Sequence, residues 1–529
     1  MQSRCSRTAK SHPAALVCFG VLLLALVSGP AWGQSLRDRI EGAIAGRVSL
    51  QSAAVGVHLR DARTGDDLYS FNGDRPLIPA SNQKLLTTGA ALRVLGPDLV
   101  FETRLGWDGG RVVIIGDGDP GLGDPALLDR GDPPMTVDAL LDQLAGAIAA
   151  AGSGRVEEIV IDDRIFDRER VHPSWPQDQL NKWYCAEVAG LNFHTNCVTF
   201  FLSGGEDGAE GVTPVVRLQP AIDGVGRWIR VDNKARTVRN GRHTAWIARA
   251  AGARPANEYT VFGDVRLGSA AAVDAAMHEP PVVFGSLLAE RLAALGVEVG
   301  RDGAGRPSVR LASPDDSFPG FKAAAVVRTG MSDILLRANT NSQNLYTEAL
   351  LKRVGHAVTR EPGSWRNGAA VVRMLVTDLL GPEHGNRTVV DDGSGMSRGN
   401  LVAASTMTAW IAEIASEPEI GPAFVRSMAQ PGEGTLRRRF ADGALTNEVY
   451  AKSGSIDGVR CLSGVVIAPG NGRAVAFSVL LNDLKHGSQI RDALALHEDV
   501  VAEIDRWLTT LPPRAVERIE AREAEAVGG

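Results

Sequence analysis

The sequence predicts an α+β fold in which strands from both ends of the chain form one antiparallel sheet, with helices on its faces. Near the start, residues 53–72 are typical of a hairpin whose strands flank a polar turn at 63–66. Near the end, three stretches alternate apolar and small residues, and a glycine turn at 470–472 joins the last two. These stretches are 448–453, 462–467 and 474–481.

The long middle of the chain begins with a mixture of short strands, glycine turns and a few helices. This mixture extends from about 98 to 321 and predicts a large inserted α/β region. Its clearest elements are strands at 111–115 and 158–161 and helices at 137–151 and 284–295.

Helices dominate from residue 331 onward. We expect them at 333–338, 342–354, 368–380 and 403–415, with a last one near 489–508. The chain therefore divides into a discontinuous main domain, 34–97 with 322–512, and accessory domains inserted at 98–321. Residues 513–529 form a charged tail that we expect to be loosely ordered.

The first 33 residues are typical of an export signal. Arg4, Arg7 and Lys10 precede an apolar run at 14–27, and a small-x-small cleavage pattern ends at Gly33. The run is short for a membrane span, although an uncleaved anchor stays open. We expect a periplasmic or otherwise extracytoplasmic protein with no stable membrane span after signal cleavage. The net charge of −6, without a clustered basic face, argues against nucleic-acid binding.

Three cysteines follow the signal. In an exported protein, Cys185 and Cys197 are a candidate disulfide, which leaves Cys461 as a buried free thiol. Small apolar packing is the alternative for all three. No metal is indicated, because no histidine lies at zinc-like spacing from this pair.

A possible nucleophile stands at the start of an apolar helical pattern. In P-A-S-N-Q-K, Ser81 precedes Lys84 by three residues, and residues i and i+3 share a helix face. The hydroxyl and the amine can therefore meet. Alone, the pattern favours a capping serine and a solvated lysine, so other motifs must decide.

A G-x-G-x-x-G at 116–121 is a weak signal for a dinucleotide site. Asp117 and Asp119 would repel a phosphate and Pro120 removes a donor, so a glycine turn is favoured. Calcium binding by Asp117, Asp119 and Asp124 is a weaker alternative.

A G-x-S-x-G at 395–399 is a stronger competitor. It places Ser397 between a strand-like and a helix-like stretch, with Asp457 and His486 following in the order of a catalytic triad. It predicts, as an alternative, an exported α/β-hydrolase esterase using Ser397. However, neither an H-G-G-G-type segment nor a βαβ rhythm accompanies it.

Two further motifs follow Ser81 and Lys84 in order along the chain. An S-x-N stands where a helix begins, and the chain's one K-S-G lies on a predicted strand. The three motifs together are the signature of penicillin-binding proteins and class A β-lactamases. Their residues are Ser81, Lys84, Ser342, Asn344, Lys452, Ser453 and Gly454.

Over most of residues 53–485 the chain resembles the D-alanyl-D-alanine carboxypeptidase/endopeptidases called class C low-molecular-mass penicillin-binding proteins. The long insertion, Trp175 with Pro176, and D-G-S-G-M-S-R at 392–398 add to the likeness, and the last accounts for the G-x-S-x-G. Two departures are Gln343, where the family has Asp, and Ser453, where it has Thr.

The resemblance implies a penicillin-recognising, β-lactamase-like sheet and a serine peptidase acting on peptidoglycan stem peptides. It implies no cofactor, and β-lactams as covalent inhibitors. A non-catalytic cell-wall-binding protein is the alternative outside enzymes, and the intact motifs argue against it.

The resemblance also implies a role for each residue of the motifs. Ser81 is the nucleophile, and Lys84 is its base, with a pKa lowered by burial and by Lys452 across the cleft. Ser342 relays a proton to the leaving amine. Asn344 holds the substrate backbone and orients Lys84.

The remaining site residues are assigned to substrate binding. Lys452 and Ser453 suit the terminal carboxylate, and the N–H groups of Ser81 and Ser455 suit the oxyanion. Gly454 lies between Ser453 and Ser455 on the predicted strand. Arg398 is expected to face an acid group of the substrate.

Overall fold

The computed structural model describes residues 35–512 except 153, 205–209, 223–228, 251–256, 441–444 and 486. The predicted signal peptide at 1–33, the tail at 513–529 and His486 lie outside the described residues. Among the described helices, none is long and apolar enough to cross a bilayer.

An antiparallel five-stranded sheet unites the two ends of the chain, as the sequence predicted. Its order is β2-β1-β22-β21-β20. The strands are β1 (Ala54–Asp61), β2 (Asp67–Phe71), β20 (Glu448–Ile456), β21 (Val459–Ala468) and β22 (Arg473–Asn482). The central strands are buried nearly throughout, because helices cover both faces.

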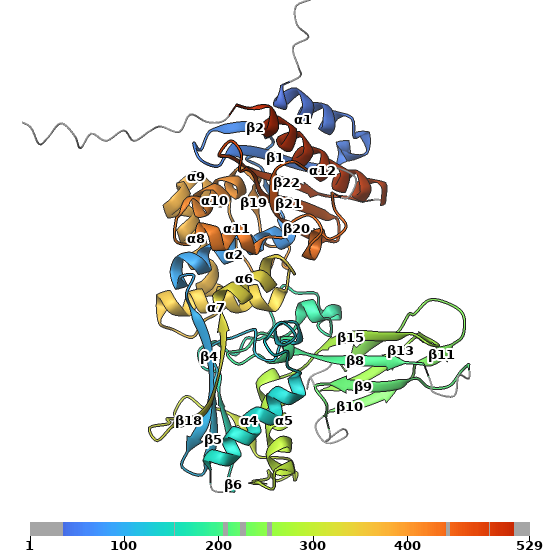
Figure 1. Cartoon of the computed structure of the whole chain (residues 1–529), viewed down its shortest axis with the longest axis vertical. Helices are drawn as coiled ribbons and strands as arrows, with labels where there is room; N and C mark the ends of the chain where they lie inside the picture. Colours follow the sequence, from blue (N-terminus) through green and yellow to red (C-terminus); the bar gives the residue numbers. More distant parts are fainter. Residues whose placement is uncertain are drawn as a thin grey trace, which may run out of the picture.

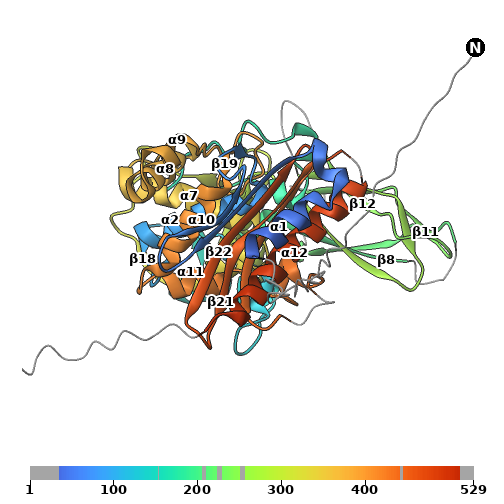
Figure 2. The ribbon, with the colours of Figure 1, turned by 90° about the horizontal axis from the view of Figure 1, so that it is seen from above.

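Two helices cover one face of this sheet. Figure 2 shows α1 (Leu36–Ala45) and α12 (Gly487–Thr510) side by side across it. Leu36 and Ile40 of α1 pack with alternate strand residues such as Val57 and Leu59 in one apolar cluster. This face therefore forms the structural back of the sheet.

The other face carries a helical layer built around α2 (Gln83–Leu95). The first ten residues of α2 are buried, as expected for a helix enclosed on all sides. Around it lie α6 (Met331–Asn339), α7 (Asn344–Thr359), α8 (Trp365–Leu380), α9 (Pro382–Asn386), α10 (Ala404–Ser416) and α11 (Gly421–Ser427). The predicted helices are all present, with ends shifted by a few residues.

A second sheet begins directly after α2. Its order is β17-β7-β5-β4-β18, and helices α4 (Val137–Ala151) and α5 (Pro280–Ala294) pack on it. The strands are β4 (Val100–Asp108), β5 (Arg111–Ile115), β7 (Ile159–Asp162), β17 (Val309–Leu311) and β18 (Lys322–Gly330). Since β18 pairs with β4, this sheet continues to Gly330, beyond the boundary that the sequence placed at 321.

The rest of the insertion forms a distal lobe that projects to one side of the molecule in Figure 1. It contains the sheets β15-β8-β9, β10-β13-β12 and β11-β14. The strands are β8 (Cys197–Ser203), β9 (Val215–Gln219), β10 (Arg230–Asn233), β11 (Arg236–Val238), β12 (Trp246–Arg249), β13 (Glu258–Phe262), β14 (Asp264–Arg266) and β15 (Ala270–Ala276).

The disulfide predicted between Cys185 and Cys197 is wrong in this structure. Both thiols are free and buried, as is Cys461. Cys185 belongs to the apolar cluster around α2, whereas Cys197 packs with Ala186 and Ala276. The spacing of two cysteines along the chain does not indicate which residues surround each of them. Both cysteines instead fit the alternative of small apolar packing.

Candidate active site

A cleft of about 580 Å³ opens where the main sheet meets the insertion. The main domain contributes the turn before α2, the start of α7, strand β20 and the loop around Met396. The insertion contributes a wall that contains Pro176, Gln179, Trp183 and Tyr184. Of the predicted site residues, Ser81, Ser342, Asn344, Ser453, Ser455 and Arg398 line this cleft.

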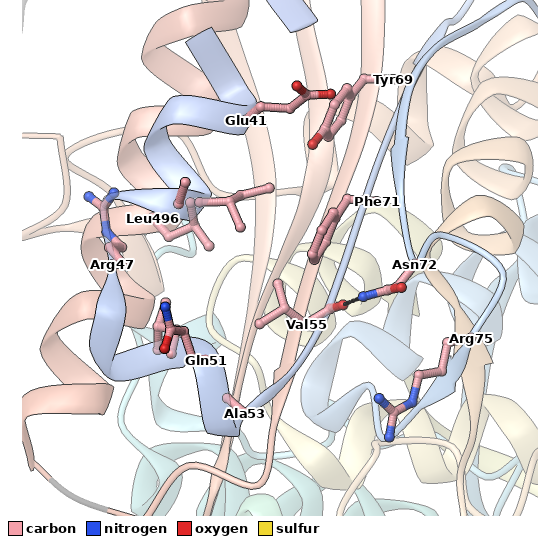
Figure 3. Close-up of a pocket in the computed structure, with 13 residues that line it drawn as sticks. Glu41, Arg47, Gln51, Ala53, Val55, Tyr69, Phe71, Asn72, Arg75 and Leu496 are labelled. Carbon is pink, nitrogen blue, oxygen red and sulfur yellow. Dashed lines mark hydrogen bonds between the residues drawn. The ribbon is translucent and has the colours of Figure 1, made fainter. Parts of the chain in front are cut away.

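Size alone does not identify this cleft. A second cavity, also about 580 Å³, lies between α1 and the β1–β2 edge of the sheet (Figure 3). Its lining is mainly apolar, with Glu41, Arg47 and Arg75 at polar positions, and it includes no serine, cysteine, lysine or histidine. Only the first of these two cavities offers a hydroxyl nucleophile with an amine nearby.

Ser81 and Lys84 occupy the junction between a short 3-10 turn, Ala80–Asn82, and α2. Lys84 has no exposed surface. Its Nζ donates to Asn344 Oδ1 at 2.7 Å and to the Ser394 carbonyl at 2.8 Å. These acceptors fix the amine at the base of the cleft.

Burial sets the proton affinity of Lys84. Desolvation lowers its pKa from 10.5 to about 7, although the carboxylates of Glu348 and Asp392 act in the opposite direction. Most of an amine with such a pKa is neutral slightly above pH 7, so it can accept a proton.

A second buried lysine faces the cleft from β20. Lys452 Nζ donates to Ser342 Oγ at 2.9 Å and to the Ser453 carbonyl at 2.8 Å. Burial, and then the charge of Lys84, lowers the pKa of Lys452 well below its ordinary value. The repulsion expected between the two lysines therefore acts mainly on Lys452.

Glycine is required at position 454 by the close approach of β20 to Ser81. A Cβ at Gly454 would lie 2.7 Å from the Pro79 carbonyl oxygen and 3.1 Å from the Ser81 nitrogen. The K-S-G glycine thus lets the strand backbone lie directly beside Ser81.

The S-x-N motif joins the main domain to the insertion. Ser342 has a left-handed backbone (φ 61°), which is uncommon outside glycine and tends to occur at functional positions. Asn344 opens α7, and its Nδ2 donates to the Tyr184 carbonyl at 2.8 Å. The amide therefore contacts the cleft wall on one side and Lys84 on the other.

Two buried acids that support Lys84 were missed in the sequence. Glu348 accepts from the Gly393 and Ser394 N–H groups, at 2.9 and 2.8 Å. Desolvation and the nearby charge of Asp392 raise its pKa to about 7. A glutamate four residues after Asn344, on the same face of the predicted helix, was the available signal.

Asp392 holds the loop after it in shape. Its carboxylate accepts from the Gly395 N–H at 2.8 Å, from the Ser397 N–H at 2.6 Å and from Trp175 Nε1 at 3.0 Å. The D-G-S-G-M-S-R run is therefore a structural loop whose Ser394 carbonyl reaches Lys84.

Ser397 lies apart from the cleft. It is fully buried, and its hydroxyl donates to Asp391 and accepts from Ser174 Oγ at 2.8 Å. Neither residue belongs to the predicted triad, and the Asp457 carbonyl accepts from Arg398 instead. The neighbouring Arg398 lines the cleft.

The aspartates of the G-x-G-x-x-G segment have protein partners. Asp117 pairs with Arg353, Asp119 accepts from Thr329 and the Gly121 N–H, and Asp124 pairs with Arg337. Within the described residues, no group of three or more acidic, histidine or cysteine side chains could hold a metal ion. These contacts connect the segment to β18 of the same sheet and to α6 and α7.

Comparisons with known proteins agree with this arrangement. The model of the D-Ala-D-Ala carboxypeptidase 3 (S13) family matches residues 36–501. The chain is 33% identical over 470 residues to a D-alanyl-D-alanine carboxypeptidase of Actinomadura sp. (strain R39), with 84% of this chain and 81% of the relative covered. The identity to D-alanyl-D-alanine carboxypeptidase DacB of Haemophilus influenzae is 24% over 443 residues, covering 83% and 87%.

The fold is also shared with a solved structure. The crystal structure of penicillin binding protein 4 (dacB) from Haemophilus influenzae matches with a TM-score of 0.68 at 20% identity. The match covers 87% of this chain and 99% of that one, so it includes the insertion as well as the main sheet.

Proposed function

Because the chain belongs to the D-Ala-D-Ala carboxypeptidase 3 (S13) family and is a serine-type carboxypeptidase of the penicillin-binding type, we propose that Ser81 is its nucleophile. The observation that carries this assignment is the buried Lys84 amine three residues away, hydrogen-bonded to Asn344 and Ser394 at the base of the cleft. We assign the catalytic domain to the main sheet with its helical layer, and the insertion to an accessory role.

The first step is attack by Ser81 Oγ on the carbonyl between the two D-alanines. A serine hydroxyl needs a base at neutral pH. Lys84 takes its proton as the new C–O bond forms. The lowered pKa of Lys84 supports this role.

The developing oxyanion needs two fixed donors. We assign them to the backbone N–H groups of Ser81 and Ser455. Ser81 stands at a helix start, where N–H groups have no partner within the helix. Strand β20 is at the edge of its sheet, so alternate backbone groups point away from β21 toward the cleft.

The leaving D-alanine amine then receives a proton through Ser342. The hydrogen bond between Lys452 Nζ and Ser342 Oγ supports this relay. The C–N bond breaks, and water hydrolyses the Ser81 ester with Lys84 again as base. The substrate's terminal carboxylate binds Lys452 and Ser453, and its negative charge favours protonated Lys452 there.

The substrates are the peptides of peptidoglycan. Asn344 holds the peptide backbone of the stem peptide, beside Gly454, and Arg398 at the cleft wall faces an acid group of it. Hydrolysis of a terminal D-alanine and of a cross-link uses the same acyl-enzyme.

β-Lactams act as covalent inhibitors, and the Haemophilus influenzae relative was solved in complex with one. We place the protein outside the cytoplasm, on the strength of the export signal at 1–33.

Labelling with a fluorescent penicillin tests the assignment. We expect a stable adduct that disappears in Ser81→Ala and persists in Ser397→Ala. Loss of the adduct in Ser397→Ala, with retention in Ser81→Ala, would establish the esterase alternative instead.

A further inference from the structure

The distal lobe exposes a stacked aromatic pair that catalysis does not use. Trp246 of β12 is 46% exposed, and its ring stacks on Phe262 of β13 with centroids 4.8 Å apart and planes 20° apart. The two residues are direct cross-strand partners. Their neighbours Ile247 and Val261 point into the lobe and are buried, so the pair lies on the outer side of the sheet.

A shallow trough of about 590 Å³ continues from Phe262 over the same sheet. Its floor holds the small residues Ala248 and Thr260, which are cross-strand partners. The trough together with the aromatic pair is called the aromatic face. Its outward side chains are Trp246, Ala248, Thr260, Phe262, Arg230, Asp232 and Glu258, with Lys234 at the margin.

Ion pairs border the aromatic face. Arg230 and Glu258 lie 3.6 Å apart, and Lys234 and Asp232 lie 3.0 Å apart. Two positive and two negative groups cancel, so the face has no excess charge to attract a polyanion or an anionic membrane. It does offer donors and acceptors near the exposed Trp246 ring, and the Lys234 amine lies 5.9 Å from the centre of the Phe262 ring.

We propose that the aromatic face binds the glycan strand of peptidoglycan, a polymer of N-acetylated amino sugars. A sugar ring presents an apolar C–H face that stacks on an aromatic ring, and an edge of hydroxyl and amide groups that suits paired carboxylates and guanidinium groups. Residues of β10, β13 and β12 all line the trough, so it extends across the sheet and gives room for an extended polymer. This inference rests on the proposed function, because the peptide substrates are attached to that glycan.

The lobe is joined to the active-site wall by direct hydrogen bonds. Asn181 Nδ2 donates to the Ile247 carbonyl at 2.6 Å, and Arg249 donates to the Leu180 carbonyl at 3.2 Å. Ile247 directly follows Trp246, and Leu180 and Asn181 lie between the cleft residues Gln179 and Trp183. A glycan held at Trp246 is therefore held at a fixed place relative to the cleft.

Binding by the full-length exported chain tests the proposal. The probes are peptide-free glycan strands prepared from peptidoglycan and a β-1,4-linked hexamer of N-acetylglucosamine. Trp246→Ala should weaken binding of the strands by about tenfold or more. Phe201→Ala is the matched control, because Phe201 is 41% exposed on β8, in a different sheet of the same lobe.

Catalysis separates this proposal from the assignment of Ser81. Trp246→Ala should hydrolyse a soluble D-Ala-D-Ala peptide and take up fluorescent penicillin as the wild type does, but release D-alanine more slowly from intact peptidoglycan. Penicillin labelling that fails in the wild type would overturn the proposed function instead.

Several results would overturn glycan binding. They are no binding of either probe by the wild type, equal binding by wild type and Trp246→Ala, or equal weakening in Phe201→Ala. Self-association or binding to anionic phospholipid vesicles that depends on Trp246, without glycan binding, would assign the face to a second copy or to a membrane.

Discussion

The active-site cleft and the aromatic face of the lobe place charged side chains in opposite environments. In the cleft, Lys84, Lys452 and Glu348 have no exposed surface. On the lobe, the side chains of Arg230 and Glu258 are 73% and 50% exposed. Desolvation shifts the pKa values of the buried set. The exposed pair adds little stability and remains available to a ligand.

The difference shows how one chain keeps the buried groups of the cleft apart from the exposed surface that we propose to bind glycan. Reaction needs an amine that loses its proton near neutrality, and burial is the largest cause of the lowered pKa of Lys84. Binding a large polymer needs accessible groups that keep their hydration until the partner arrives. Replacing a buried charged residue at the cleft, with an exposed residue of the same type as the control, therefore tests this difference.

Replacing Lys84 should have the largest effect. Lys84→Met should slow acylation by penicillin by about 10² to 10⁴-fold, since it removes the amine that we propose as general base. Lys234→Met, in the exposed set, should acylate normally. Stopped-flow fluorescence measures both rates, and a normal rate in Lys84→Met would place the base elsewhere.

The same variant has a defined effect on stability. The unfolded lysine holds its proton up to about pH 10.4, whereas the folded pKa is about 7. Between these values the unfolded state binds more protons, so this group makes the wild type more stable as pH rises. The melting temperature of Lys84→Met relative to wild type should therefore be highest at and below about pH 7 and decline toward pH 10.

Glu348 should have the next largest effect. In Glu348→Gln, the amide cannot accept from all the N–H groups that the carboxylate now binds, so the loop that holds Lys84 should loosen and acylation should fall about tenfold. Loss of the negative charge should also lower the pKa of Lys84. The acid limb of the pH–rate profile should therefore move to lower pH.

The exposed Glu258 supplies the control for this shift. Glu258→Gln should leave both the acylation rate and the profile unchanged, because it lies on the lobe surface. An unshifted pH–rate profile in Glu348→Gln would mean that Glu348 holds the loop at 393–394 but does not affect the pKa of Lys84.

The sequence indicated the residues at the cleft better than the buried acids that support them. Ser81, Ser342 and Lys452 were found because their motifs occur in order on elements that local patterns identify. Glu348 and Asp392 were missed because an acid's burial depends on helices far apart in sequence. The pairing of β18 with β4 joins residues separated by the whole insertion, and no local pattern indicates it. The disulfide prediction was wrong for the same reason, since spacing along the chain does not indicate which residues surround each thiol.

Backbone contact in the cleft can be tested with a glycine pair. In Gly454→Ala, the new Cβ would push β20 away from Pro79 and Ser81, so acylation should fall, by less than about tenfold. Gly470, in the turn after β21, has no atom within 4 Å of the position that a Cβ would occupy, so Gly470→Ala should acylate normally. Equal rates in the two variants would show that the close approach is not needed.

The smallest effect is expected for the cysteines, which test whether the two regions are covalently joined. Cys185 packs beside the cleft and Cys197 at the base of the lobe, both as free thiols. Burial raises the pKa of Cys185 to about 12 and also raises the pKa of Cys197. Alkylation should therefore be slow in the folded protein and complete in denaturant without reductant.

Reductant should leave the melting temperature unchanged. Because a native disulfide typically contributes about 2–4 kcal/mol, a fall of several degrees, together with recovery of a Cys185–Cys197 peptide, would restore the cross-link that the sequence suggested.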